Sequence, residues 1–229
     1  MKQRLDHLAI IMDGNARWAK TQGKTKAEGH KKGAEVAKAL LPHLSRLGIN
    51  YLTLYAFSSE NWQRPEEEVS ILISLLSQYI LNETKLLNKY GIRLKVIGNL
   101  SRLSAALQLK IAAAVKDTAN NTNTTVCVAF SYGGRSEIVD ACQKVISSEI
   151  QQVTESNFKN FLYDPEMPDV DLLIRTSGVY RISNFLLWHL AYAELYFLDK
   201  FWPEFTIYDL EKAIENYSAR QRTFGIREQ

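Results

Sequence analysis

The sequence predicts an α/β protein: a single domain with a central, mostly parallel sheet of about six strands, flanked by helices and containing an apolar tunnel. Short apolar runs rich in β-branched and aromatic residues recur along the chain, and helical patterns separate them. Such an alternation is typical of a parallel sheet that is covered on both faces. No linker, repeat or low-complexity tract divides the 229 residues. Residues 1–229 are therefore expected to form one domain.

Six short runs are expected to be strands. Most of them are followed by Gly, Asn, Asp or Ser, which commonly end a strand in a turn. In chain order they are residues 7–12, 51–57, 92–97, 125–130, 170–174 and 194–198. Between them, residues 33–47 and 103–119 have the apolar spacing of helices.

A further helix is predicted after Pro65, because proline and three glutamates form a favourable first turn. Its continuation, residues 69–81, is apolar on nearly all sides except for a narrow stripe of serines and Gln78. Such a helix must be covered on several sides. It is either a central core helix, or a wall that faces both the sheet and an apolar cavity or partner subunit.

Composition and charge narrow the function classes. The chain is 46% hydrophobic and 23% charged with a net charge of +3, an excess too small to indicate nucleic acid as a partner. Cys127 and Cys142 lack metal-ligand spacing and are more typical of free thiols in a reducing compartment than of a disulfide. There is no apolar signal region and no membrane-spanning run. We expect a cytoplasmic protein, with peripheral contact at the inner face of the membrane left open.

The unusual polar residues follow the predicted strands. Residues 13–15 follow the first strand, residues 58–62 the second and residues 175–178 the fifth. In open α/β sheets, ligands bind outside the carboxyl ends of the strands. These three clusters therefore predict one site at one edge of the sheet.

The first cluster contains Asp13, Gly14 and Arg17. Asp13 follows a buried strand, so its carboxylate is expected at the rim of a pocket. Gly14 permits close backbone approach, a helix starting there would favour an anion, and Arg17 would add a forked set of donors. The alternative is that Asp13 or Asn15 merely caps the helix.

The other clusters also allow two interpretations. The basic stretch around His30 indicates either an anion site or a solvated surface, and Trp62 either contacts a ligand or covers the edge of the core. Arg175 and Arg181, with neighbouring hydroxyls, suit a diphosphate clamp better than surface ion pairs. Glu194 lies in an apolar and aromatic run, where an unpaired carboxylate would be costly to bury. Paired with Asp13, it would make an oxygen site for Mg²⁺.

Together these residues resemble the cis-prenyltransferase family. The resemblance extends from residue 7 to residue 225 in five ordered blocks, which makes it far more specific than any single motif. The blocks are HLAIIMDGNARWA at 7–19, LTLYAFSSENWQRP at 52–65, DLLIRTSG at 171–178, RISNFLLWHLAYAELYF at 181–197 and RQRTFG at 220–225. The resemblance implies a magnesium-dependent transferase that adds isopentenyl diphosphate in cis to an allylic diphosphate such as farnesyl diphosphate. The products are a long polyprenyl diphosphate and pyrophosphate, and the family also implies a homodimer.

The resemblance also implies roles for individual residues. Asp13 is the expected catalytic aspartate, Asn61 or Ser58 assists proton removal, and Glu194 completes the magnesium site, within the chain or across a dimer. The allylic diphosphate is expected to contact Gly14, Asn15, Arg17 and His30. Isopentenyl diphosphate is expected to contact Arg175, Arg181 and Ser183. The site is expected to close with the help of Trp62 and Arg64. Further substrate contacts are expected from Ala16, Trp18, Lys26, Ser59, Glu60 and Ile182. The C-terminal motif expected to reach the partner's site includes Arg222 and Gly225.

Three positions depart from the family's common pattern: Ala16 replaces glycine, Lys26 replaces arginine and Val179 replaces glutamate. Ala16 adds a methyl group near the diphosphate, and Lys26 keeps the charge but loses the fork. Because the product grows by apolar units, we expect residues 69–81 to form a tunnel wall, with strand contributions from Leu94, Val96 and Val128.

The sequence fits three other functions less well. An accessory subunit on the same fold would be expected to lose the metal carboxylate and the diphosphate arginines, which this chain keeps. A phosphatase is disfavoured because Asn15, rather than a second aspartate, follows two residues after Asp13. A trans-prenyltransferase would be helical with aspartate-rich motifs, and the sequence has neither.

Overall fold

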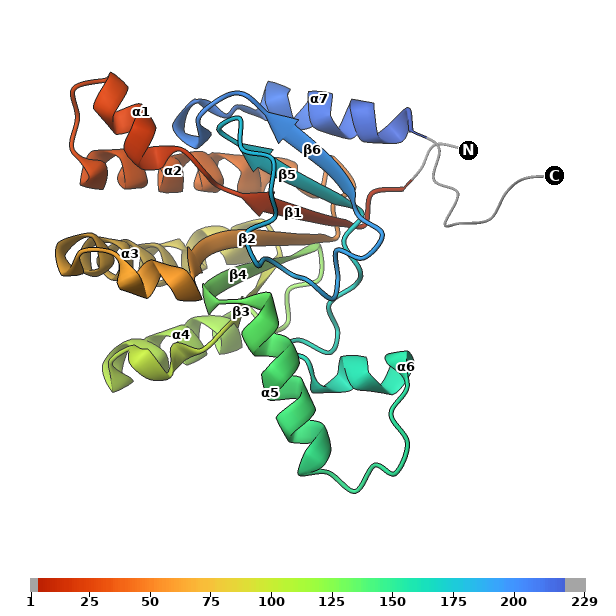
Figure 1. Cartoon of the computed structure of the whole chain (residues 1–229). Helices are drawn as coiled ribbons and strands as arrows, with labels where there is room; N and C mark the ends of the chain where they lie inside the picture. The colour runs from red at the N-terminus through yellow and green to blue at the C-terminus, as the bar shows by residue number, and fades with distance from the viewer. Residues whose placement is uncertain (1–3, 221–229) are drawn as a thin grey trace.

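The computed structural model describes residues 4–220, except for the side chains of residues 79–82. Its six strands form one sheet in the order β3-β4-β2-β1-β5-β6, and every neighbouring pair is parallel (Figure 1). The strands are β1 (His7–Ile11), β2 (Tyr51–Ser58), β3 (Ile92–Ile97), β4 (Thr124–Tyr132), β5 (Leu172–Thr176) and β6 (Glu194–Leu198). The predicted α/β class is confirmed, with a wholly parallel sheet.

Seven α-helices occur within residues 4–220. They are α1 (Asn15–Thr21), α2 (Lys26–Leu40), α3 (Glu66–Lys89), α4 (Ala105–Asp117), α5 (Gly134–Ile146), α6 (Glu155–Phe158) and α7 (Ile207–Ser218). The helix expected at residues 33–47 begins earlier, because Thr25 and Glu28 form a capping box there. It also ends earlier, because Pro42 would remove a hydrogen bond from a longer helix.

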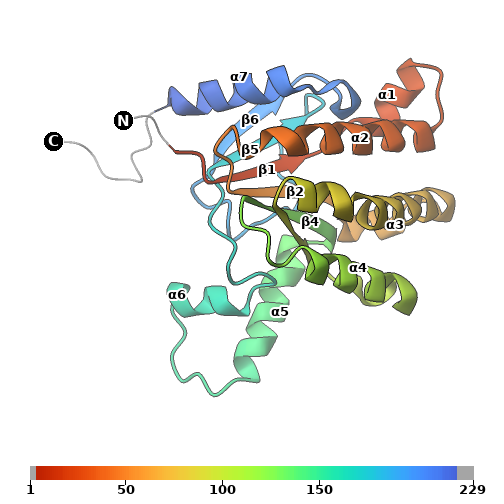
Figure 2. The same cartoon turned by 180° about the vertical axis from the view of Figure 1, so that it is seen from behind.

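Helices α2, α3, α4 and α7 cover one face of the sheet (Figure 2). Alternate strand residues such as Leu8, Ile10 and Leu54 belong to the core on this face. Their neighbours Ala9 and Ile11 belong to a second core on the other face, which includes segments that flank β5 in the chain. This alternation buries both faces and leaves the carboxyl ends of the strands open to form a site.

The strand register determines which residues share an edge. Ile11 aligns with Tyr55 on one side and with Arg175 on the other, so Asp13 and the segments after β2 and β5 lie at the same edge. Glu194 is the first residue of β6 and aligns with Leu172, at the beginning of the neighbouring strand. Asp13 therefore lies at the carboxyl ends of the strands and Glu194 at their amino ends, separated by roughly 16 Å along the strand direction.

Two further features bear on the sequence predictions. Cys127 is buried and Cys142 is exposed, and both are free thiols. Within residues 4–220, no helix combines the length and the apolar character needed to cross a membrane.

Candidate active site

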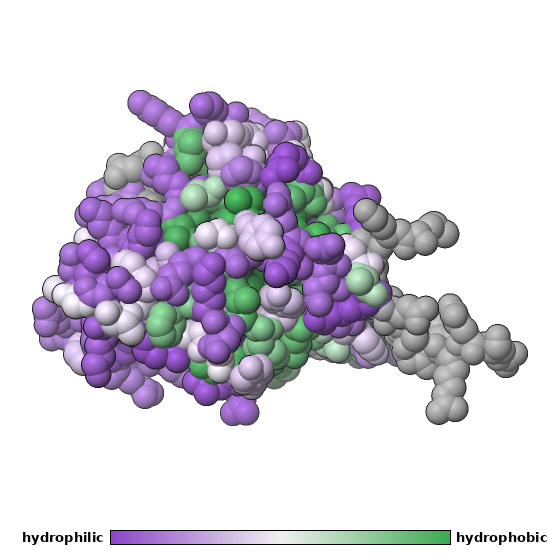
Figure 3. All heavy atoms as spheres, turned by 90° about the horizontal axis from the view of Figure 1, so that it is seen from above, coloured by the Kyte–Doolittle hydropathy of each residue, from purple (hydrophilic) through white to green (hydrophobic). Residues whose placement is uncertain are grey.

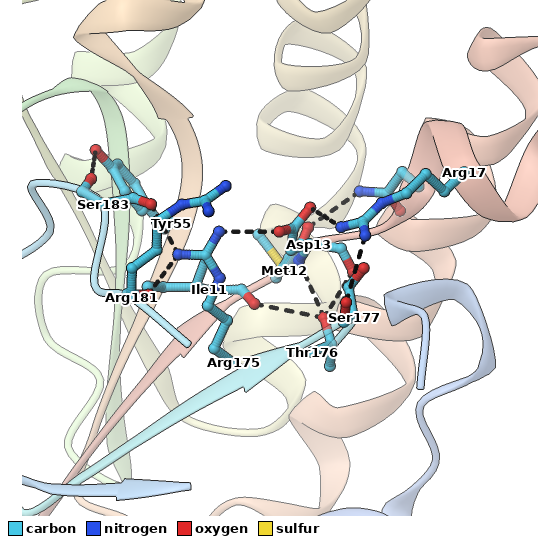
Figure 4. A network of polar contacts seen from close by, with 11 residues as sticks. Ile11, Met12, Asp13, Arg17, Tyr55, Arg175, Thr176, Ser177, Arg181 and Ser183 are labelled. Carbon is cyan, nitrogen blue, oxygen red and sulfur yellow. Dashed lines mark hydrogen bonds and ion pairs between the residues drawn. The ribbon is translucent and has the colours of Figure 1, made fainter. Parts of the chain in front are cut away.

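Asp13 lies between two arginines at the carboxyl edge of the sheet (Figure 4). Its Oδ2 accepts a hydrogen bond of 2.9 Å from an Arg175 terminal nitrogen, and its Oδ1 is 3.2 Å from an Arg17 terminal nitrogen. The Asp13 side chain is 28% exposed, whereas that of Arg175 is 5% exposed. The buried arginine and the open carboxylate thus form a charged rim that solvent or a ligand can reach.

The backbone of Asp13 is held by two other segments of the chain. The Thr176 hydroxyl donates to the Asp13 carbonyl at 2.7 Å and accepts from its N–H at 3.0 Å, and the Trp202 N–H donates to the same carbonyl at 3.0 Å. The N-cap position, directly before α1, is Gly14 in the left-handed conformation with φ 107°, and no side chain caps the helix. Asp13 therefore does not cap the helix, which removes that alternative for it.

Arg175 also organises the segment after β5. Its other terminal nitrogen donates to the Arg181 carbonyl and, at 2.7 Å, to the Ser183 hydroxyl. Ser183 and Asn184 adopt left-handed backbone conformations with φ 48° and 60°, which turn this segment back towards the rim. The Tyr55 hydroxyl donates to the Ser183 carbonyl at 3.3 Å and so helps to hold the turn.

The segment after β2 forms the third side of the rim. Asn61 Oδ1 accepts from the Ser58 N–H at 3.0 Å, so these two residues are held together. Glu60 accepts from the Asn184 amide at 2.8 Å and links this segment to the one after β5. Burial raises the pKa of Glu60, but this hydrogen bond and others outweigh it, and the net pKa is lowered.

Trp62 faces the protein interior. Its indole N–H donates to the Ser131 hydroxyl at 2.8 Å, and its ring packs edge-on against Phe57 with centroids 5.1 Å apart. The Arg102 guanidinium lies 4.1 Å from the indole centroid. The structure thus favours the alternative in which Trp62 covers the edge of the core.

The basic stretch at the start of α2 meets α3. Glu68 is 2.7 Å from the Lys26 ammonium and 2.9 Å from Arg64, and these charges outweigh the effect of burial so that the pKa of Glu68 is lowered. His30 lies beside this cluster, with Nε2 4.0 Å from Glu68. Burial lowers the pKa of His30 to about 4 despite that carboxylate, so its imidazole is neutral near pH 7.

The rim opens into a cavity of about 740 Å³ that continues beneath α2 and α3. Its deeper walls are mainly apolar and include Leu72, Leu75 and Leu76 from α3. Leu94 and Val128 contribute from the sheet as expected, whereas Val96 does not line the cavity. The helix that is apolar on most sides therefore faces an apolar cavity in addition to packing in the core, as the second interpretation of residues 69–81 predicted.

Most of the predicted site residues line this cavity. They are Asp13, Gly14, Asn15, Ala16, Arg17, His30, Ser58, Glu60, Asn61, Arg64, Arg175, Arg181 and Ser183. Others lie outside the lining: Trp18, Lys26, Ser59, Trp62, Ile182 and Glu194. The lining also contains Tyr55, Asn184 and Trp202, which the sequence analysis did not select. Trp202 follows β6, so the rule that ligands bind at the carboxyl ends of strands could have identified it.

Several buried polar atoms at this rim lack a hydrogen-bond partner. Within residues 4–220, unpartnered buried side-chain atoms are found on Asn15 (Oδ1), His30 (Nε2), Arg175 (Nε) and Ser177 (Oγ), and elsewhere only on His189. Buried polar groups are normally satisfied, and exceptions often mark sites where a ligand or water completes the bonding. Their concentration here is consistent with a polar ligand.

The expected magnesium site differs from the prediction. Glu194 is paired with Arg220 at 2.6 Å at the opposite edge of the sheet, so the expectation that one chain brings it to Asp13 is wrong. No group of three or more His, Cys, Asp or Glu side chains placed to hold a metal occurs in the described part of the chain. Asp13 alone, with its exposed side, still fits Mg²⁺ binding of the kind that uses one carboxylate, waters and substrate phosphates. Arg222 and Gly225 lie outside the described residues.

Comparisons with known proteins identify the family. A family profile described as "Putative undecaprenyl diphosphate synthase" matches residues 11–225. An isoprenyl transferase of Rickettsia sibirica is 59% identical over 97% of this chain and 99% of its own length. A ditrans,polycis-undecaprenyl-diphosphate synthase ((2E,6E)-farnesyl-diphosphate specific) of Vibrio cholerae is 50% identical over 96% of this chain and 90% of its own length.

Two solved structures share the fold. Lavandulyl diphosphate synthase from Lavandula x intermedia, in complex with dimethylallyl diphosphate, has a TM-score of 0.93 and 35% identity, covering 97% of this chain and 98% of the other. A probable undecaprenyl diphosphate synthase from Campylobacter jejuni has a TM-score of 0.84 and 34% identity, covering 97% and 99%. The wholly parallel sheet also excludes the helical trans-prenyltransferase class. The chain belongs to the undecaprenyl diphosphate synthase family of cis-prenyltransferases, the enzymes of cis-prenyl chain elongation.

Proposed function

We propose that this cis-prenyltransferase adds isopentenyl diphosphate units to an allylic primer similar to farnesyl diphosphate and releases a long-chain polyprenyl diphosphate of the undecaprenyl type. The observation that supports this most directly is the cavity itself. A charged rim at the carboxyl edge of the sheet opens into a largely apolar space. This combination suits a substrate with a diphosphate at one end and a growing hydrocarbon chain at the other.

In the proposed reaction, the allylic carbon–oxygen bond breaks and its electron pair leaves with pyrophosphate. The double bond of isopentenyl diphosphate supplies the electrons for the new carbon–carbon bond, and a proton is then lost to form the cis double bond. Charge on the departing oxygens increases during the first step, and preorganised donors at that position lower the barrier. Arg17 and the helix that begins beside it are placed to supply such donors.

The residue roles follow from the rim. We assign the allylic diphosphate to Gly14, Asn15, Arg17 and the neutral His30, which can donate a hydrogen bond without adding charge. The second diphosphate is assigned to Arg175, Arg181 and Ser183. Ser58 or Asn61, which are linked to each other, would assist proton removal.

Magnesium dependence is part of the proposal. Asp13 would hold the ion together with phosphate oxygens, and the bound ion would stabilise charge on the leaving group. The chain's own contribution is to position Asp13, through Thr176 and Trp202, so that its carboxylate faces the diphosphate. A role for Glu194 in metal binding requires a second chain, because it lies at the other edge in its own.

A homodimer is proposed on the family resemblance and on the exposed side of β6. β6 is an edge strand, and Tyr180, Tyr192 and Leu195 near it are exposed. Figure 3 shows apolar atoms among polar ones on the face at the top of Figure 1, where α7 and β6 lie. Sedimentation velocity of the purified chain, compared with Leu195→Lys, tests this assignment.

Release of so apolar a product is further proposed to involve peripheral contact with a membrane.

The central experiment measures chain elongation. Purified protein is incubated with farnesyl diphosphate, radiolabelled isopentenyl diphosphate and Mg²⁺, and the products are sized. Elongation is expected for the parent and for Asp117→Ala, an exposed carboxylate on α4. Asp13→Asn, which keeps the shape of the side chain but removes the charge, is expected to reduce the rate by about 10² to 10³-fold. Release of phosphate without elongation would favour a phosphatase, and absence of elongation until a second protein is added would favour an accessory subunit.

A further inference from the structure

Among the described side chains, two lysine–glutamate ion pairs join α2 to α3, one near the rim and one deeper along the cavity. Near the rim, the Lys26 ammonium is 2.7 Å from Glu68. Further along, the Lys38 ammonium is 2.6 Å from Glu83. Apart from His30 near the rim, the described lining residues between the pairs are small or apolar: Gly33, Ala34, Ala37, Leu72, Leu75 and Leu76. The proposed function assigns no role to the second pair.

The Lys38–Glu83 pair lies in the deep part of the cavity. Lys38 follows His30 by roughly 12 Å along α2, and Glu83 follows Glu68 by roughly 22 Å along α3, at 1.5 Å per residue. The lining residues of the sheet at this depth include Leu94 and Val126, which lie near the beginning of β3 and β4 and therefore far from the carboxyl edge.

The pair differs chemically from its surroundings. Glu83 is 15% exposed and Lys38 is 45% exposed, so the carboxylate is the more deeply buried partner. The neighbouring lining residues Leu41 and Leu87 are apolar. Among the described residues that line the cavity, the other charged side chains come from the segments that form the rim, at or near the carboxyl edge. A hydrocarbon chain that reaches this depth would have to displace water from both charges, or separate them and leave a largely buried carboxylate unpaired.

We infer that the Lys38–Glu83 pair limits the length of the product: it is a specificity-determining polar contact in the wall of the hydrocarbon cavity. This inference rests on the proposed function, because it requires a prenyl chain to grow into the cavity. Early units meet only apolar walls and gain burial at each addition. Units added after the tail reaches the pair gain less free energy from burial, because they bring apolar surface against two charges that hold α2 and α3 together.

The test replaces the pair in two ways. The double variant Lys38→Met, Glu83→Met keeps long side chains but removes both charges, and methionine adapts readily to irregular apolar space. The double variant Lys38→Glu, Glu83→Lys exchanges the charges and can re-form the pair. The matched control is Lys32→Met, Glu35→Met, which removes an exposed pair on α2 with a separation of 3.5 Å that does not line the cavity.

Products of the farnesyl diphosphate assay are resolved by chain length. The apolar variant is expected to shift its main product upward by roughly one five-carbon unit or more, because each added unit gains burial without desolvating a charge. The exchanged pair and the control are expected to keep the parent's distribution. An apolar variant with unchanged or shorter products would overturn the inference.

Three further outcomes separate the inference from the proposed function. If both pair variants fold, as judged by circular dichroism, but fail to elongate, the pair is required for condensation and the inference is wrong. If the parent elongates normally while the apolar variant leaves the length distribution unchanged, only the inference fails. If the parent itself does not elongate the primer, the proposed function fails, and the inference that rests on it fails too.

Discussion

Gly29 allows α2 to approach α1 closely, and its replacement by alanine provides a quantitative test of the fold. A Cβ atom at this position would lie 2.4 Å from the Asn15 carbonyl oxygen, 3.1 Å from its carbonyl carbon and 2.9 Å from the Ala19 Cβ. Two of these neighbours are backbone atoms of α1, which cannot rotate away. The helices would therefore have to separate at the point where α1 supplies Asn15 and Arg17 to the rim.

Two opposing effects determine the free energy of unfolding of Gly29→Ala. Alanine in a helix interior is favoured over glycine by about 1 kcal/mol. Overpacking typically costs about 1–3 kcal/mol, and contact with backbone places this case towards the upper end. The expected net destabilisation is about 1–2 kcal/mol, which lowers Tm by about 2–8 °C for a chain of this size.

Urea and thermal unfolding followed by circular dichroism measure this difference. Lys32→Ala on the exposed side of the same helix is the control, and its stability should stay within about 0.5 kcal/mol of the parent. The elongation rate of Gly29→Ala should also fall, because the rim residues on α1 shift. Equal or greater stability of Gly29→Ala would refute the reasoning, since helix propensity would then outweigh the packing.

Three further perturbations test the site and the core. Arg175→Lys keeps the charge but loses the fork that reaches Asp13, and should lower kcat/KM for isopentenyl diphosphate by about 10 to 100-fold, equivalent to one charge-assisted hydrogen bond. The pKa of His30 is lowered from 6.5 to about 4 in the folded chain, so the unfolded chain binds the proton first as pH falls. Stability should therefore be lost between pH 6.5 and 4, by roughly 2 kcal/mol at pH 5, and His30→Gln should remove this part of the loss in urea unfolding. Lys95→Met should destabilise the protein by about 3 kcal/mol in the same measurement, because it leaves the buried Asp164 carboxylate without its cation at 2.7 Å.

Each of these three predictions has a result that would contradict it. Arg175→Lys with unchanged kinetics would mean that charge alone suffices at the rim. Equal losses of stability in the parent and in His30→Gln on going from pH 7.5 to pH 5 would mean that His30 is not the group that titrates. Lys95→Met with parental stability would mean that the hydroxyl of Tyr51, which also contacts Asp164, satisfies that carboxylate by itself.

The sequence was sufficient to predict the sheet and to place the candidate site residues after β1, β2 and β5 at one edge of it. Residues 92–97 and 194–198 match β3 and β6 in full, and the other strands differ by one or two residues at their ends. This success has a physical reason: a parallel strand buried on both faces is a nearly continuous apolar run, and the polar residues after it necessarily lie at its carboxyl end. Asp13 and Arg175 could therefore be placed at one rim before their contact was known.

Predictions that depended on which end of an element a residue occupies were less successful. Glu194 was correctly assigned to a strand, but as the first residue of β6 it lies at the opposite edge from Asp13. Lys26 was expected at the substrate, yet it pairs with Glu68, which lies 42 residues away in the chain. Long-range pairing of this kind leaves no local periodic signal in a sequence. The inward orientation of the Trp62 indole could not be predicted for the same reason, since its partner Ser131 belongs to a distant strand.

The pairing of Asp13 with two guanidinium groups has a consequence for how ligands assemble. The Asp13 carboxylate is paired with both guanidinium groups, so the cluster carries one excess positive charge. On the proposed function, a diphosphate that draws either arginine towards its oxygens would uncover the carboxylate for a divalent cation, and a cation on the carboxylate would free the arginines in return. Each ligand then raises the affinity for the other by the same factor, as thermodynamic reciprocity demands. Titrations of Mg²⁺ and of the diphosphate, each performed with and without the other, should give matching shifts in Kd.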